Sequence, residues 1–177
     1  MQHIETVTVG SGGAASITFS AIAADWTDLV ILFSFRSAAG GSSAGKITFN
    51  TSGGTYTRRR LGGDGSSAFS DTPAFDYTIN DSARTANTFA NGSIYIPNYR
   101  SSVAKSYSTD SVNENNATSA VQTIYAGLWS GTDPITSITL QDQAVANLVE
   151  FSSASLYGIT AGSDGIVTVS YAAGKVK

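Results

Sequence analysis

The feature that most constrains this chain is an alternation of apolar and polar residues with a period of two, repeated along most of its length. Val, Ile, Thr, Tyr and Phe dominate the alternating segments, and Gly, Asn, Asp, Ser or Pro interrupts them about every ten residues. A period of two sends successive side chains to opposite faces of a strand, whereas a helix needs a period near 3.6. Because helical periodicity is sustained nowhere, the sequence predicts an all-β protein with no substantial helix.

Short connections between the alternating segments favour antiparallel pairing, because parallel strands need long crossovers that are usually helical. We therefore predict an antiparallel β-sandwich of jelly-roll type with roughly eleven strands. The glycine-rich turn at 10–13 predicts an opening hairpin, and the polar stretch at 66–90 predicts long surface loops. The segments that alternate are 4–9, 17–19, 29–37, 46–50, 56–61, 75–79, 92–97, 105–111, 120–129, 135–140, 155–159 and 166–171.

The length of the chain, 177 residues, fits a single β-sandwich domain over residues 1–177 with one sizeable core. Residues 172–177 do not continue the alternation and are interpreted as a frayed or anchoring tail. The N-terminal residues lack the basic and apolar regions of a signal peptide, and no apolar run reaches the roughly 20 residues of a membrane span. We expect neither export by a signal peptide nor membrane insertion.

The composition argues against several kinds of chemistry. Charged residues make up only 13% and the net charge is −3, so no positive field favours nucleic acid. There is no cysteine, and His3 is the only histidine, which leaves acid–base catalysis without a suitable pair. The sequence predicts neither an enzyme nor a bound cofactor. Calcium held by the loops around Asp64 and Asp81 is a weaker alternative.

The densest charge in the chain is the run Arg58, Arg59 and Arg60. In a strand, Arg58 and Arg60 share one face and Arg59 takes the other. One interpretation is a solvated strand edge protected against wrong pairing. The other, which makes these arginines candidate subunit contacts, is a salt bridge to an acidic neighbouring subunit.

Aromatic residues offer a second candidate site. An aromatic platform on which sugar rings stack could be formed by Tyr95, Tyr99, Tyr125 and Trp129, with Tyr99 and Trp129 as the main candidates, although such side chains are more often core residues. Alternation places Tyr125 and Trp129 on the same face of one strand, where one could be buried and the other exposed at a rim. Both interpretations, core packing and glycan binding, stay open at this point.

Several phrases of the sequence, taken in order, resemble a family of small virion structural proteins of tailed bacteriophages, especially phages of marine bacteria and cyanobacteria. The resemblance covers nearly the whole chain and is strongest in its last phrase. The phrases include Ile4-Glu5-Thr6-Val7-Thr8-Val9, Asp25-Trp26-Thr27-Asp28-Leu29-Val30, Asn87-Thr88-Phe89-Ala90-Asn91-Gly92-Ser93-Ile94-Tyr95-Ile96-Pro97-Asn98-Tyr99 and Ala154-Ser155-Leu156-Tyr157-Gly158-Ile159.

The resemblance implies a role on the phage particle and brings no catalytic residue with it. We expect an outer-surface subunit, either head decoration or cement or a fibre or appendage domain, made in the host bacterial cytoplasm and located in the virion. Its expected partners are other virion proteins of the capsid or tail scaffold. The low charge and many small residues favour a homo-oligomer, with a trimer preferred. The alternative function is a carbohydrate-binding module that recognises a host-surface glycan from a tail or head fibre.

Overall fold

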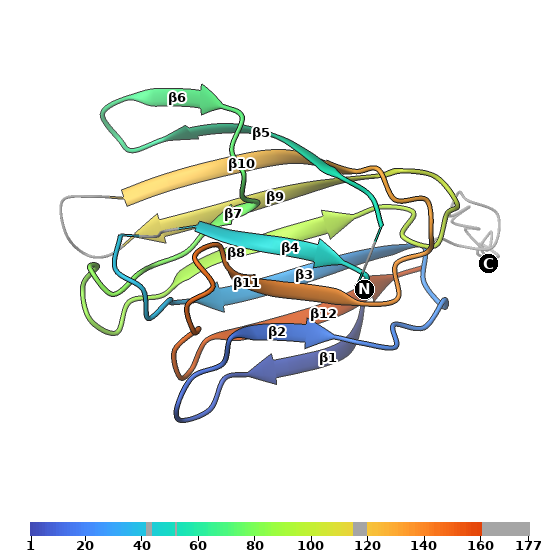
Figure 1. Cartoon of the computed structure of the whole chain (residues 1–177), viewed down its shortest axis with the longest axis horizontal. Coiled ribbons are helices and arrows are strands. Elements are labelled where there is room, and N and C mark those ends of the chain that lie inside the picture. The colour runs from blue at the N-terminus through green and yellow to red at the C-terminus, as the bar shows by residue number, and fades with distance from the viewer. Residues whose placement is uncertain (42–43, 52, 115–119, 161–177) are drawn as a thin grey trace, which may run out of the picture.

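The computed structural model describes residues 1–41, 44–51, 53–114 and 120–160, which form twelve strands and no helix (Figure 1). The predicted all-β class is therefore confirmed. The strand predicted at 166–171 and the tail at 172–177 lie outside the described residues. The strands are β1 Gln2–Thr8, β2 Ser16–Phe19, β3 Asp28–Phe35, β4 Ala44–Phe49, β5 Tyr56–Gly63, β6 Ala68–Asp71, β7 Tyr77–Thr78, β8 Ala90–Ile96, β9 Lys105–Glu114, β10 Ala120–Trp129, β11 Ile138–Asp142 and β12 Ser153–Ile159.

The strands form two antiparallel sheets that enclose a common core. The larger sheet has eight strands in the order β1-β12-β3-β8-β9-β10-β5-β6, and the smaller has four in the order β2-β11-β4-β7. In Figure 1 the strands β2, β11 and β4 lie in front of the larger sheet, and one hydrophobic cluster joins side chains from both sheets. This arrangement is compatible with the predicted β-sandwich, and the jelly-roll connectivity stays a prediction.

The opening hairpin predicted from the glycine-rich turn is wrong. Strand β1 pairs with β12 in the larger sheet, whereas β2 pairs with β11 in the smaller one. Gly12 and Gly13 both have positive φ, 96° and 77°, and Ala14 then hydrogen-bonds through its backbone to Leu148. The turn carries the chain from one sheet to the other, because Ile17 and Phe19 bury their side chains in the core from the smaller sheet.

The stretch at 66–90 is also more ordered than predicted. Strand β6 pairs with β5, β7 pairs with β4, and residues 76–81 are all buried. Their polar side chains have polar partners inside the sandwich: the hydroxyl groups of Thr78 and Ser111 are hydrogen-bonded at 3.0 Å. The polar composition suggested a surface loop, because polar residues are buried only where they find hydrogen-bond partners. Those partners lie on distant strands, which composition does not reveal.

The core has an apolar half and a polar half. In β3 the inward residues Leu29, Ile31, Phe33 and Phe35 are all buried. In β9 the inward positions alternate just as regularly, and the residues there are Lys105, Tyr107, Thr109, Ser111 and Asn113. The inner face of the larger sheet is therefore held by apolar packing at β3 and largely by hydrogen bonds at β9.

Glycine–aromatic pairs recur between neighbouring strands of both sheets. In each, a ring packs over a glycine directly opposite, and a Cβ on that glycine would overlap the ring. Rings of this kind cover the exposed backbone that a strand glycine leaves. The pairs are Gly45 with Tyr77, Gly62 with Phe69, Gly92 with Phe33 and Gly127 with Tyr107.

This packing predicts that Gly127→Ala destabilises the protein, because the added methyl group overlaps the Tyr107 ring. We expect the free energy of unfolding to fall by about 1–3 kcal/mol, the usual cost of overpacking. Denaturant titration followed by tryptophan fluorescence measures the change. The control is Gly10→Ala, since Gly10 has no atom within 4 Å of the added Cβ. Equal unfolding midpoints for both variants would contradict this account of the pairs.

Candidate interaction surface

A buried carboxylate, Asp76, connects the two sheets. The guanidinium of Arg58 on β5 donates to it twice, through Nε at 2.6 Å and Nη2 at 3.0 Å. The backbone N–H of Ile47 on β4 donates at 2.9 Å, and the hydroxyl of Tyr107 on β9 donates as well. The carboxylate is fully buried, so these donors replace the water that it would otherwise bind.

The charges of this network are fixed by its surroundings. Burial lowers the pKa of Arg58, but the hydrogen bond and the negative charge of Asp76 outweigh it and raise the pKa overall. Burial raises the pKa of Tyr107, and the adjacent Asp76 raises it further. Arg58 therefore stays charged and Tyr107 stays neutral around physiological pH.

The arginine run divides as strand alternation predicts. Arg58 and Arg60 point to the inner side of β5, where Arg60 donates through Nε to Asp71 of β6 at 2.9 Å. Its guanidinium also lies over the Phe69 ring, 4.7 Å from the centroid. Arg59 points the other way and is exposed. Among the described residues it donates only to the carbonyl of Arg58, at 2.7 Å. Two of the three candidate subunit contacts are thus engaged within the chain, and Arg59 remains available.

Of the two interpretations of Tyr99 and Trp129, core packing is confirmed and the glycan platform on these residues is not, because both residues are only 1% exposed. The Tyr99 hydroxyl donates to the carbonyl of Ala23, and Trp129 Nε1 donates to the carbonyl of Gly53 at 2.8 Å. Tyr125 shares the inward face with Trp129 as predicted, and it is buried too. Alternation identified the common face correctly but did not reveal that this face is the interior.

The outer face of the eight-stranded sheet, the side turned away from the four-stranded sheet, carries most of the exposed apolar side chains. Among the described residues nine large hydrophobic side chains are exposed, and five of them lie on this face. Several exposed apolar side chains on one face of a sheet point to an interaction site. The five, with their exposed fractions, are Leu32 (43%), Leu61 (53%), Tyr95 (40%), Ile124 (50%) and Leu128 (41%).

The strand register aligns these side chains in rows across the outer face. One row runs through Leu61, Ile124, Asp110, Ser93, Leu32, Ser155 and Thr6. The next runs through Arg59, Ala126, Ser108, Tyr95, Val30, Tyr157 and His3. Both rows mix large apolar residues with small or hydroxyl side chains, so the face has both protruding and recessed positions.

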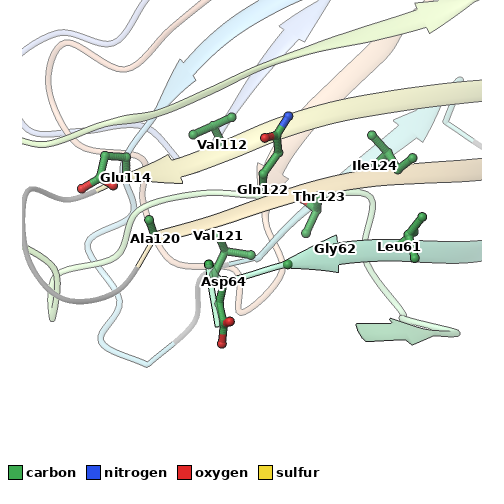
Figure 2. Close-up of a pocket in the computed structure, with 12 residues that line it drawn as sticks. Leu61, Gly62, Asp64, Val112, Glu114, Ala120, Val121, Gln122, Thr123 and Ile124 are labelled. Carbon is green, nitrogen blue, oxygen red and sulfur yellow. The ribbon is translucent and has the colours of Figure 1, made fainter. Parts of the chain in front are cut away.

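Two hollows occupy the β5 side of the outer face. The central hollow, about 420 Å³, lies over β8, β9, β10 and β5, with Arg59 and Asp110 among its lining residues. The end hollow, about 580 Å³, lies where β5 and β9 end and β10 begins. Figure 2 shows Gln122 and Ile124 projecting from β10 on the opposite side from Thr123, with Asp64 and Glu114 at the rim of the end hollow.

The calcium alternative has little geometric support. Asp64 Oδ1 accepts from the backbone N–H groups of Ser67 at 2.8 Å and Ser66 at 2.9 Å, and these bonds lower the pKa of Asp64 to about 2. Asp81 is buried and accepts from the N–H of Ala83 at 2.9 Å. Within 1–41, 44–51, 53–114 and 120–160, no group of three or more His, Cys, Asp or Glu side chains could hold a metal ion. In the same residues no helix is long and apolar enough to cross a membrane.

Comparison with known proteins does not identify a family for this chain, so its interpretation depends on the chemistry of its surface. No protein-family model matches the chain, and no curated protein or solved structure matches it significantly. The outer face is also the feature that sequence reasoning missed. The sequence did contain a signal for it. Leu32 is a large apolar residue at an outward position of β3, and Ile124 and Leu128 lie on the face of β10 opposite to the face that carries Trp129.

The buried network predicts that Asp76→Asn is strongly destabilising, because it leaves the Arg58 charge buried without its partner. We expect a loss of about 3–5 kcal/mol in the free energy of unfolding. The matched control is Asp71→Asn, which removes the half-exposed partner of Arg60 and should cost less than about 1 kcal/mol. Denaturant titration compares the two variants. A similarly small loss of unfolding free energy in both variants would show that the hydrogen bonds of Asp76 do not hold the two sheets together.

The raised pKa of Tyr107 predicts a loss of stability at alkaline pH. The unfolded chain releases this phenol proton near pH 10, whereas the folded chain retains it at higher pH. The contribution of the neutral Tyr107 hydroxyl to the free energy of unfolding is therefore complete below pH 10 and decreases as the pH rises above 10. We expect Tyr107→Phe to show a shallower alkaline decline than the wild type in unfolding experiments at stepped pH. Parallel declines would contradict the assignment.

Proposed function

We propose that this chain is a structural protein of a bacteriophage virion, an outer-surface subunit that acts by protein–protein contacts through the outer face of its larger sheet. The observation that carries the proposal is the set of exposed side chains Leu32, Leu61, Tyr95, Ile124 and Leu128 on one continuous sheet face. The sequence resemblance supports the phage particle as the setting. Head decoration, cement, and a fibre or appendage domain are the forms that this role can take.

The chemistry of the outer face suits a protein partner. Interface cores are depleted of charge and enriched in aromatic residues, with a polar rim around them. Here Leu61 and Ile124 face one another across β5 and β10, Ser93 and Ser108 supply hydroxyl groups, and Asp64 lies at the rim. Covering apolar surface of this kind contributes about 25 cal/mol per Å² before the costs of association.

The rigidity of the face also supports a contact role. The inner sides of the same strands are tied by the Arg58–Asp76 pair and by the hydroxyl groups of Thr78, Ser111 and Thr123. A preorganised surface loses little conformational entropy when it binds. Capsid or tail proteins are the partners that this proposal implies, in a virion assembled in the host bacterial cytoplasm.

A carbohydrate-binding module of a tail or head fibre is the second candidate, and with Tyr99 and Trp129 buried it would need other rings. Tyr95 is the aromatic residue that favours it: its ring is 40% exposed, and its hydroxyl donates to Asp28 at 2.8 Å. Saturable binding of host polysaccharide that is lost in Tyr95→Ala would support this candidate over a purely structural role.

The proposal predicts that the chain is present in purified particles of the phage that encodes it. Quantitative mass spectrometry should give a fixed copy number, and cryo-electron microscopy should place the outer face against a neighbouring protein. Recombinant chain added to particles that lack it should rebind, and Ile124→Asp should weaken rebinding at least tenfold, because a charge then enters an apolar contact.

The matched control for rebinding is Thr48→Asp, which adds the same charge at an exposed position of β4 in the other sheet. It should rebind like the wild type. Absence of the chain from particles, or equal loss of binding in both variants, would contradict the proposal.

A further inference from the structure

The central hollow of the outer face combines three features that point to a specific partner. Its lining includes three small side chains, Ser93, Ser108 and Ala126. Beside it, Leu61 and Ile124 are directly paired, both at least half exposed, and form an apolar ridge. Its lining also includes the cation Arg59 and the anion Asp110. Arg60 lines it too, but its guanidinium is paired with Asp71.

These two charges do not satisfy one another within the chain. The Asp110 side chain has no hydrogen-bond or ion-pair partner in the part of the chain that the structure describes, and Arg59 donates only to a neighbouring carbonyl. They lie two strands and two residues apart, about 12 Å at the usual strand spacings. Each is therefore exposed and available to an opposite charge from outside.

We propose that the partner at this hollow is a second copy of the same chain, related by a two-fold axis, with Arg59 of each copy paired to Asp110 of the other. The axis lies in the interface along the perpendicular bisector of the line from Arg59 to Asp110. Such an axis sets each of the two side chains opposite its counterpart, and the contact closes on itself.

The composition of the face favours a second copy over a different protein. Away from the strand ends, the described outer positions of β8, β9, β10 and β5 carry Arg59 and Asp110 as their charges, so the net charge there is zero. A strongly acidic or basic partner would leave one of the two repelled. A second copy satisfies both, and its Leu61–Ile124 ridge can enter the small-residue hollow.

The area that the two copies share suits a reversible dimer. The axis passes over β10, so the contact covers β8, β9, β10 and β5. Four strands about 4.8 Å apart and about eight residues long give roughly 500 Å² per copy, at the lower end for a specific interface. The inference rests on the proposed role of the outer face as a contact surface, and it takes the neighbouring protein across this face to be another copy of the chain rather than a different capsid or tail protein. It replaces the trimer expected from composition with a two-fold dimer.

Reciprocal charge reversal tests the pairing directly. Sedimentation equilibrium of the full-length chain should show a dimer, and Arg59→Asp or Asp110→Arg alone should each weaken it at least tenfold by setting like charges together. An equimolar mixture of the two single variants should dimerise like the wild type, because opposite charges then meet at both contacts. The double variant should also recover. Ser108→Trp, which fills the hollow without changing charge, should abolish the dimer.

The control is Lys46→Asp on β4, which makes the same charge change as Arg59→Asp on the opposite side of the molecule and should leave the dimer unchanged. A monomeric wild type, a trimer, or a mixture that fails to associate would overturn the inference. A monomer that still binds particles through Ile124 would overturn the dimer and leave the proposed function standing. A dimer in solution together with absence of the chain from particles would overturn the proposed function and leave the dimer standing.

Discussion

The structure depends on the burial of one carboxylate, Asp76, between its two sheets. A buried charge must be paired and hydrogen-bonded, and the donors come from β5 and β9 of the larger sheet and from β4 of the smaller. Apolar contacts alone tolerate sliding, whereas Arg58 and Tyr107 reach Asp76 only in one relative placement of the sheets. The positions of β5, β9 and the strand between them, β10, follow from that placement, and with them the outer face.

On the β5–β9 side of the molecule, the usual distribution of polarity is partly reversed. The inner positions hold Arg58, Thr109, Ser111 and similar groups, while the outer positions of β10 hold Ile124 and Leu128. A sheet whose outer side faced only water would not need large apolar residues there. The reversal is physically consistent if another molecule covers the outer face, and this is why the contact role explains more of the chain than a site for chemistry does.

Much of the fold was predictable because alternation is a local signal. It gave the all-β class, most strands, and the opposite directions of Arg58 and Arg59. It did not identify which face was inside, so Trp129 was considered for a glycan platform although it is core. The turn chemistry at 10–13 is the same for a hairpin and for a change of sheet, and only the burial of Ile17 in the opposite layer decides between them.

The contact surface was harder to predict because it arises from register between strands distant in sequence. Leu61 and Ile124 are adjacent only after β5 pairs with β10. Hydroxyl-radical footprinting of the chain, dilute and in assembled particles, tests its role most directly. The account predicts that assembly protects Leu61, Ile124 and Leu128, while exposed residues of the four-stranded sheet such as Thr48 continue to react. Protection of the four-stranded sheet with an unchanged outer face would contradict it.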